Sequence, residues 1–428
     1  MKIFKTTDES FEKEFNEILA RGAMDIDNVT PIVKNIIDEV RNEGDTALIR
    51  HISKFDKWNP TPSTLKISTD EMKKAYQNID NELKEALQLA FDRIKSYHEK
   101  QLPKSWLDFE DNGTILGQKV TAVERAGVYV PGGKAFYPSS LLMNVIPALV
   151  AGVKEIVVTT PVIENKPNEL LLAACHLCGI DEVYKVGGAS AIAAMAYGTE
   201  SIKKVDVITG PGNIFVATAK KMVYGEVNID MIAGPSEIGI IADESAKPNY
   251  MAIDLLSQAE HDEMASSIMI TTSEELANET KTEIYKFLDE LERKEIATKS
   301  IKERGAIIIA KNLDEAITLM NEIAPEHLEI VTTNPFELLP KIKNAGAIFL
   351  GENTPEPIGD YIAGPNHTLP TGGSAKFYSP LNVEIFMKKS SIISFSKNAI
   401  LEMGDKCALL AKTEMLTAHQ KSVLERLK

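Results

Sequence analysis

The first hundred or so residues carry apolar side chains at helical spacing between many charged ones. Apolar residues that recur every three or four positions predict amphipathic helices. We expect such helices over Phe11–Leu19, Val29–Gly44 and Thr69–Lys100. No evident chemistry lies in this stretch, which we interpret as a scaffold or dimer element.

From about Glu124, short apolar runs alternate with helix-like segments. The runs predict strands at Ala126–Val130, Ile156–Thr160, Glu182–Val186, Val205–Thr209 and Val227–Ile232. The segments between them predict helices at Ser139–Val153, Asn168–Cys178, Ser190–Tyr197 and Ile214–Tyr224. This alternation indicates βαβ units and a parallel sheet with helices on both faces.

A second region of the same kind starts near Ser236. Its predicted strands are Ile238–Ala242, Ser267–Thr272, Ala306–Ala310, His327–Thr332 and Ala347–Leu350, and its predicted helices are Asn249–His261, Glu274–Glu292 and Leu313–Ile323. A loop rich in Gly, Pro and Asn follows at Gly351–Gly373, and the tail returns to helix-like segments at Leu381–Lys388 and Met403–Leu427. The predicted fold class is therefore α/β, with two Rossmann-like parallel-sheet domains, a helical N-terminal segment and a C-terminal helical tail.

Three glycine turns lie at predicted strand ends of the first α/β region: Gly132-Gly133, Gly187-Gly188 and Gly210-Pro211-Gly212. Ligands of parallel sheets bind beyond the carboxyl ends of the strands, and glycine lets the backbone approach a phosphate. Gly-x-Gly-x-x-Gly is absent, so the usual dinucleotide fingerprint is missing. On their own, these turns fit nucleotide binding and simple tight turns about equally well.

Composition and charge narrow the class of protein. A chain of 428 residues is expected to form two or more domains. The net charge of −15 disfavours nucleic acid and anionic membrane as partners. The longest apolar stretch, Leu141–Val153, is too short to span a bilayer, and the N-terminus lacks the apolar run of a signal peptide. We therefore expect a cytoplasmic protein.

Three cysteines give no disulfide framework. Cys175 and Cys178 form a Cys-x-x-Cys pair with His176 between them, which is open to a zinc or redox interpretation. No second pair completes a tetrahedral site, and a buried helix with two small apolar residues is the better interpretation.

The candidate chemistry lies in the few histidines, of which the chain has seven. Gln258 and His261 are three residues apart on a predicted helix and so project from one face, where they suit a metal ion or an ordinary polar pair. Glu326 and His327 are adjacent, and both residue types serve as general bases.

Two further histidines stand near carboxylates. Asp360 and His367 lie in the glycine-rich loop, and loops of this composition often carry functional residues. The alternative is that Asp360 only forms an Asx turn and that His367 is an ordinary surface residue. Glu414 and His419 lie near the C-terminus, where His419 is otherwise a solvated side chain. The absence of His-Glu-x-x-His and Gly-x-Ser-x-Gly disfavours the common zinc and serine hydrolases.

Taken together, these motifs are far more specific than any one of them. They are Gly-Val-Tyr-Val-Pro-Gly-Gly (127–133), Gly-Pro-Gly-Asn (210–213), Ala-Gly-Pro-Ser-Glu (233–237), Gln-Ala-Glu-His-Asp (258–262), Pro-Glu-His-Leu (325–328), Gly-Pro-Asn-His-Thr-Leu-Pro-Thr-Gly-Gly (364–373) and the terminal Ala-His. In this order and spacing the sequence resembles the histidinol dehydrogenase family over essentially its full length.

The resemblance implies a role for each matching position. It implies one zinc ion per subunit, with ligands Gln258, His261, Asp360 and His419, and it implies Glu326 and His327 as catalytic bases. It implies that the substrate is contacted by these metal ligands and by His327, Ser236, His367 and Glu414. It implies that NAD is contacted by Tyr129, Ser190 and Asn213. It also implies a homodimer in which the tail, 381–428, crosses to the partner's site.

The resemblance implies the four-electron oxidation of L-histidinol to L-histidine through L-histidinaldehyde, with two NAD reduced, in the last steps of histidine biosynthesis. A paralogue that oxidises another small alcohol, such as a sulfonated diol, is the nearest alternative. A catalytically silent nucleotide-binding protein is a third, and it predicts the loss of a ligand or base.

Two positions depart from the family pattern. Ser190 stands where a Gln that contacts NAD is usual, and Met415 stands where Gly is usual. We expect domains at 1–25, at 26–125 together with 236–380 (metal and catalytic residues), at 126–235 (NAD) and at 381–428.

Overall fold

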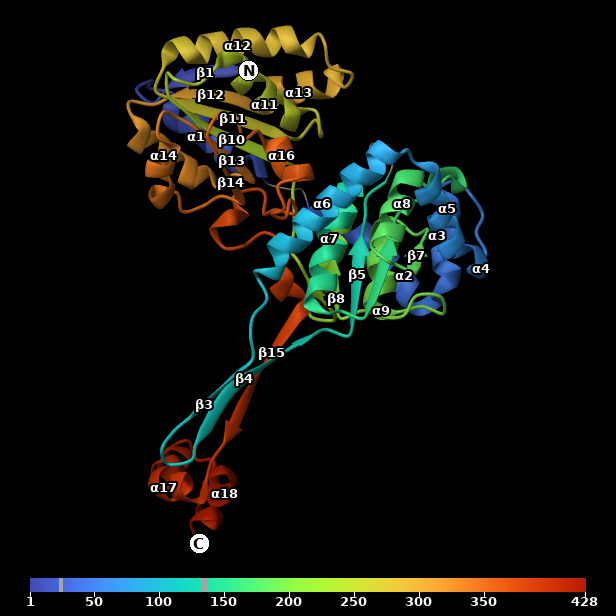
Figure 1. Cartoon of the computed structure of the whole chain (residues 1–428), viewed down its shortest axis with the longest axis vertical. Helices are drawn as coiled ribbons and strands as arrows, with labels where there is room; N and C mark the ends of the chain where they lie inside the picture. Colours follow the sequence, from blue (N-terminus) through green and yellow to red (C-terminus); the bar gives the residue numbers. More distant parts are fainter. Residues whose placement is uncertain (23–25, 133–137) are drawn as a thin grey trace.

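The computed structural model describes residues 1–22, 26–132 and 138–428. It contains two six-stranded sheets and one three-stranded sheet. Figure 1 shows two bodies, each a sheet covered by helices, and a long arm that carries α17 and α18 at its tip. Gly133, part of the first predicted glycine turn, lies outside the described residues.

The first sheet has the strand order β1-β12-β11-β10-β13-β14, and every pair in it is parallel. Its strands are β1 Lys2–Lys5, β10 Glu237–Ala242, β11 Ser266–Thr271, β12 Gly305–Ile309, β13 His327–Val331 and β14 Ala347–Leu350. The helices around it are α1 Phe11–Leu19, η1 Ala20–Gly22, α11 Pro248–Ala259, α12 Glu274–Leu288, α13 Lys294–Arg304, α14 Leu313–Ile323, α15 Pro335–Leu338, η3 Leu339–Lys341 and α16 Glu356–Tyr361. Every residue of β10, β11 and β13 is buried, as expected for strands covered on both faces.

The second sheet has the order β2-β7-β6-β5-β8-β9, with only β2 antiparallel. Its strands are β2 Lys66–Ile67, β5 Arg125–Tyr129, β6 Glu155–Thr159, β7 Glu182–Tyr184, β8 Val207–Thr209 and β9 Asn228–Ile229. Its helices are α2 Ile26–Glu43, α3 Asp45–Phe55, α4 Pro62–Leu65, α5 Thr69–Asn78, α6 Asn81–Glu99, α7 Pro138–Ala151, η2 Ile163–Asn165, α8 Glu169–Leu177, α9 Gly188–Tyr197 and α10 Ile214–Val223.

The two sheets share one topology. In chain order, β5 to β9 lie in space as third, second, first, fourth and fifth, and β10 to β14 lie in the same way. This is the order of a Rossmann-type doubly wound sheet, with its switch point between the first and fourth strands. The prediction of two Rossmann-like domains is confirmed.

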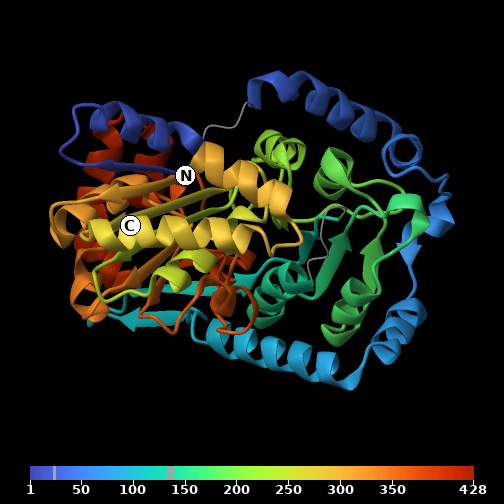
Figure 2. The same cartoon turned by 90° about the horizontal axis from the view of Figure 1, so that it is seen from above.

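The helices of residues 26–99 pack on the second sheet. Val33, Ile37 and Leu48 share a core with Ile192 of α9, and Ile94 shares another with strand β5. Figure 2 shows α2 and α6 on opposite sides of this body. This packing differs from the expected grouping of 26–125 with 236–380, because helical periodicity reveals a buried face but not the sheet that buries it.

The arm is a three-stranded antiparallel sheet that sequence patterns did not predict. Its strands are β3 Trp106–Phe109, β4 Ile115–Ala122 and β15 Met387–Ser394, in the order β15-β4-β3. The expected helix at Leu381–Lys388 is wrong, since the short 3-10 helix η5 Val383–Phe386 leads directly into β15. β3 is exposed at every position and so gives no alternation of buried and exposed residues.

Beyond the arm, the tail forms α17 Lys397–Thr413 and α18 Thr417–Leu427. The strand β1 at the N-terminus was not predicted either; it pairs Lys2 with Ala306 at the edge of the first sheet. The helix η4, Ser374–Lys376, lies in the glycine-rich loop. Among the described residues, no helix has the length and apolarity needed to cross a bilayer.

Candidate functional site

The pair Glu326-His327 stands at the amino end of β13. Helix α14 ends at Ala324, which adopts a left-handed conformation (φ 49°), and Pro325 then prevents the helix from continuing. Both side chains are buried, with exposed fractions of 7% for Glu326 and 3% for His327. The turn therefore places two titratable groups at the edge of the first sheet, next to the start of β10.

His327 is held in one orientation by the main chain. Its Nδ1 lies 3.0 Å from the carbonyl oxygen of Glu237, the first residue of β10. Because a carbonyl only accepts, Nδ1 carries a hydrogen, and Nε2 has no hydrogen-bond partner among the described residues. Nε2 lies 3.6 Å from Asp360 Oδ1 and 3.7 Å from Glu356 Oε1. This nitrogen is thus the one available to a substrate.

Burial and neighbouring charges shift the pKa of both groups. Burial raises the pKa of Glu326 to about 8, although His327 opposes the shift. Burial alone would lower the pKa of His327, but the carboxylates of Glu326, Asp360 and Glu356 outweigh it and raise this pKa to about 10. For Asp360, burial acts to raise the pKa, yet His327 and His367 lower it overall. These are the perturbed pKa values expected of a functional site.

Gln258 and His261 approach this cluster from the C-terminal end of α11. Gln258 is fully buried, and neither its amide oxygen nor its amide nitrogen has a hydrogen-bond partner among the described residues. The electrostatic neighbours of His261 are Asp360, His327 and His367, so the four side chains lie close together. Burial is the main cause that lowers the pKa of His261, which keeps this imidazole neutral and its lone pair available.

The buried amide of Gln258 indicates a missing ligand. An unpaired amide inside a protein is costly, and a helix C-terminus favours a positive charge. His327, Glu356 and Asp360 also present ligand atoms within 4.8 Å of one another. Imidazole, carboxylate and amide groups are a donor set that suits a divalent transition metal such as zinc. The residues present therefore fit a metal ion.

Sequence reasoning missed a run of carboxylates behind this cluster. Glu356 lies beside Asp360, and its backbone N–H donates to Glu329 Oε1 at 2.8 Å. Asp254 adjoins Glu329, and burial raises the pKa of all three carboxyls. Spacing was the available signal, because Glu356 stands four residues before Asp360 on α16 and Asp254 stands four residues before Gln258 on α11.

The remaining predicted substrate residues divide into two groups. Ser236 directly precedes β10, and His367 has a buried Nε2 without a hydrogen-bond partner among the described residues. Both therefore belong to the neighbourhood of His327. Glu414 and His419 are exposed at the end of α17 and in α18, which Figure 1 shows at the tip of the arm, far from β13 and α16. One copy of the chain does not bring them to the other ligands.

The predicted cofactor residues lie at the carboxyl edge of the second sheet. Tyr129 ends β5, and its hydroxyl accepts from the backbone N–H of Gly188 at 3.3 Å. Gly210 follows β8 with φ 118°, and a Cβ there would lie 2.0 Å from the carbonyl oxygen of Tyr129. Only glycine fits this close approach. Asn213 is exposed and caps α10 by accepting from the backbone N–H groups of Phe215 and Val216.

A buried ion pair anchors the Gly210 turn. Lys220 forms an ion pair with Asp230 and also donates to the carbonyl oxygen of Gly210 at 2.9 Å. Asp230 accepts from the backbone N–H of Gly210 at 2.8 Å and from that of Met231 at 2.6 Å. Both peptide groups of Gly210 are therefore fixed by side chains from α10 and from the segment after β9.

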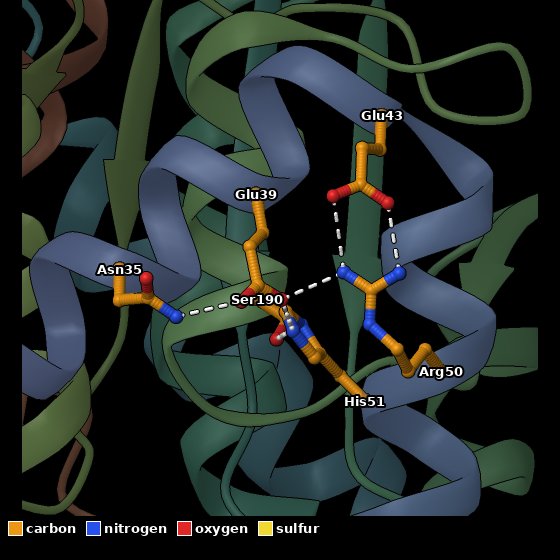
Figure 3. A network of polar contacts seen from close by, with 6 residues as sticks. All are labelled: Asn35, Glu39, Glu43, Arg50, His51 and Ser190. Carbon is orange, nitrogen blue, oxygen red and sulfur yellow. Dashed lines mark hydrogen bonds and ion pairs between the residues drawn. The ribbon is translucent and has the colours of Figure 1, made fainter.

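Ser190 is committed to another network (Figure 3). Its hydroxyl lies 2.8 Å from Nδ1 of His51, whose Nε2 lies 2.7 Å from Glu39. Arg50 and Asn35 hold the same carboxylate at 2.8 and 2.6 Å, and Glu43 pairs with Arg50. Because Glu39 is ionised and only accepts, Nε2 of His51 carries a hydrogen. His51 thus belongs to a defined network of hydrogen bonds and ion pairs.

The two halves of the site use opposite sheet edges. The glycine turns of the second sheet follow strand ends, as expected for ligands of parallel sheets. Ser236 and the pair Glu326-His327 instead precede β10 and β13, and so they lie at the amino edge of the first sheet. In Figure 1 the arrow of β5 points toward the body of the first sheet.

Comparisons with known proteins identify the family of the chain. The family profile described as histidinol dehydrogenase matches residues 19–427. Among curated relatives, the histidinol dehydrogenase of Wolinella succinogenes is 68% identical over 418 residues, which are 97% of this chain and 97% of that protein. That of Sulfurimonas denitrificans is 68% identical over 427 residues, which are 99% of each chain.

A solved structure agrees as well. The crystal structure of histidinol dehydrogenase from Elizabethkingia anophelis superimposes with a TM-score of 0.94 at 36% identity, covering 100% of this chain and 98% of that one. The resemblance seen in the sequence is confirmed, and the chain belongs to the histidinol dehydrogenase family of oxidoreductases.

Proposed function

We propose that the protein oxidises L-histidinol to L-histidine through L-histidinaldehyde, with two NAD reduced, as the last steps of histidine biosynthesis. The observation that carries this proposal is the fully buried, unpaired amide of Gln258, three residues before His261, whose electrostatic neighbours include Asp360, His327 and His367. The relatives that share 68% of its residues carry the name of this activity. We also propose that the enzyme acts in the cytoplasm, without nucleic acid or membrane as a partner.

The metal would be one zinc ion per subunit, held by Gln258, His261 and Asp360, with His419 of a second copy as the fourth ligand. Zinc there would orient and polarise the substrate alcohol and, as a positive charge beside Asp360 and Glu356, would bring the pKa of His327 back toward neutrality.

His327 serves as the base for the alcohol. Its Nδ1–H is fixed on the Glu237 carbonyl, so Nε2 takes the hydroxyl proton while hydride leaves carbon for NAD. Glu326, with its pKa raised to about 8, accepts a proton from the water that attacks the aldehyde in the second oxidation. Ser236, His367 and Glu414 would hold the imidazole and amine of the substrate, which the metal ligands and His327 also contact.

NAD would bind at the carboxyl edge of the second sheet, over Tyr129 and Asn213. Ser190 is the third predicted contact, but its hydroxyl is already hydrogen-bonded to His51. The contact at this position would therefore be weaker than one from an amide side chain, and Tyr129 and Asn213 would carry more of the affinity.

The arm supports the proposal of a homodimer with shared sites. Glu414 and His419 lie on exposed helices at its tip, and the arm exposes large apolar side chains along its length. The most exposed of these are Phe109, Ile393, Leu409, Leu410 and Met415. Apolar surface of this extent on an extended element is typical of a protein–protein interface. The tail would reach the site of the partner and supply its last ligand.

The direct test supplies the purified protein with zinc, NAD and L-histidinol. We expect two NADH for each histidine and loss of activity on chelation. His261→Asn should abolish both zinc binding and turnover. The matched control His176→Asn, at a half-buried ring beside Tyr76, should keep both. One NADH per substrate with accumulating aldehyde would contradict the four-electron reaction, and turnover only on another alcohol, such as a sulfonated diol, would favour the paralogue.

Shared sites are tested by mixing two inactive variants. His419→Asn removes the ligand on the tail, and Glu326→Gln removes a base in the body. If tails cross, a mixed dimer has one site with both defects and one with neither, so mixing restores activity. No recovery after demonstrated subunit exchange would contradict the crossed tail.

A further inference from the structure

The two proposed bases are both held by a single residue, Glu237. Its backbone N–H donates to Glu326 Oε2 at 2.8 Å, and its carbonyl oxygen accepts from His327 Nδ1 at 3.0 Å. The direction in which each base points therefore depends on where the peptide groups of Glu237 lie.

The side chain of Glu237 is itself anchored by a buried charge. Its carboxylate, 3% exposed, lies 3.3 Å from Nη2 of Arg21, which is 6% exposed. The backbone N–H of Gly372 also donates to this carboxylate. Arg21 belongs to η1, in the N-terminal segment, far from β10 in sequence. Among the described residues, its Nε and Nη2 have no hydrogen-bond partner, so the ion pair with Glu237 is the main contact of this end of the guanidinium.

The turn that carries Arg21 is fixed from several sides. Arg21 Nη1 donates to the carbonyl oxygen of Ile18 at 2.8 Å, and Arg304 donates to the carbonyl oxygen of Arg21 at 2.7 Å. A Cβ on Gly22 would lie 2.3 Å from Cα of Gly372, so the turn is packed directly against the loop that contacts Glu237. Contacts other than the ion pair with Glu237 therefore also fix the position of the guanidinium.

Stability alone is a poor reason for such a pair. Removing two charges from water is costly, and a protein with apolar side chains of similar volume in their place is often as stable. A rigid ion pair does, however, fix the residue that it anchors. We propose that Arg21 is a positioning residue that acts through Glu237 to aim Glu326 and His327 at the substrate. This inference rests on the proposed function of these two bases.

The experiment compares Arg21→Met with Arg21→Lys, which keeps the charge, and with Arg304→Met, which removes a contact of the same turn without touching Glu237. The kcat and KM are measured with zinc and NAD for both L-histidinol and L-histidinaldehyde, relative to the wild type and per folded protein. A misplaced base lowers kcat on both substrates and leaves the KM nearly unchanged. We expect Arg21→Met to lose between about 10- and 100-fold in kcat, with KM changed by less than about threefold.

Arg21→Lys should recover a large part of this loss, and Arg304→Met should stay within about twofold of the wild type. The inference is overturned if Arg21→Met keeps the wild-type kcat, or if Arg304→Met loses as much as Arg21→Met does, because the contact then merely secures the N-terminal segment. If Arg21→Met does not fold, Glu237→Gln answers the same question, since it keeps the shape of the side chain and removes the ion pair. A wild type that is inactive on histidinol contradicts the proposed function instead, and the same ratios are then measured on the alcohol that it does oxidise.

Discussion

The buried pair of Lys220 and Asp230 allows a quantitative prediction. Lys220→Met keeps most of the side-chain volume but removes the charge, and so leaves Asp230 as a buried carboxylate without its cation. Neither side chain exposes more than 3% of its surface, so water cannot replace the lost partner. The free energy of unfolding should therefore fall by far more than at a surface ion pair.

The magnitude follows from the contacts that remain. Breaking a buried pair by removing one partner costs about 3–5 kcal/mol. Asp230 keeps two backbone N–H donors, from Gly210 and Met231, so Lys220→Met should lie near the lower end, at about 3 kcal/mol. Asp230→Asn should cost at least as much, because one of the two backbone donors then faces an amide nitrogen, which cannot accept, and Lys220 loses its counter-charge. The double variant removes both charges and should cost clearly less than the sum of the single changes.

Urea unfolding followed by tryptophan fluorescence gives the measurement. The chain has two tryptophans, and Trp106→Phe removes the one on the arm, so that Trp58, which packs on the core of the second sheet, reports alone. Lys204→Met is the matched control in the same body, since its ion pair with Glu226 is exposed at both ends. Lys220→Met should also raise the KM for NAD, because the Gly210 turn loses its anchor, whereas Lys204→Met should not. An unfolding midpoint for Lys220→Met equal to that of the control would refute the reasoning.

Three further predictions concern single side chains. Gln258→Leu should weaken zinc binding more than tenfold, by calorimetry, yet leave the metal-free protein at least as resistant to urea, because the buried amide has no hydrogen bond to lose. Burial raises the pKa of Asp56 from 3.8 to about 6, so the folded state binds this proton more tightly than the unfolded state and loses stability as the pH rises across that range. Asp56→Asn should lack this loss, so its free energy of unfolding should rise by about 1–2 kcal/mol relative to that of the wild type between pH 4 and pH 7. If the two proteins differ by the same free energy at pH 4 and at pH 7, this prediction is contradicted. Ser190→Ala should leave the KM for NAD within about twofold while lowering stability by about 1 kcal/mol, and a large rise in KM would show that the hydroxyl does serve the cofactor.

Sequence patterns predicted the two parallel sheets well, because strands that are buried on both faces read as short apolar runs. They failed where buried and exposed residues do not alternate at a regular spacing along the chain. β3 is exposed throughout, and β15 follows a short 3-10 helix that resembles the start of a longer helix. The shared strand order of the two sheets was also beyond the sequence, since which strands become neighbours depends on long-range packing.

The candidate site shows the same division. Residues within one short motif, such as Gln258 with His261 or Glu326 with His327, could be paired from spacing alone. Asp360 and His367 were joined to them by family resemblance, and the structure brings both close to His261 and His327. Glu356 and Arg21 escaped notice because each resembles an ordinary charged residue until the fold buries it.

The strand β1 has a consequence for the order in which the chain folds during synthesis. The strands of the second sheet and the helices α2 to α10 lie between residues 26 and 229, so most of that body can form while the ribosome is still making the rest. Leu381, Val383 and Phe386 are added to its buried core later. The first sheet can be completed only later, because β1 pairs Lys2 with Ala306 of β12. The strand β1 therefore has no partner until β12 has been synthesised. We expect nascent chains stalled near residue 270 to protect the 26–229 region from protease while their first residues remain accessible. The strand β15 of the arm and the helices α17 and α18 are made after both bodies, so an incomplete chain can have folded bodies but lacks part of the surface proposed to recognise another copy.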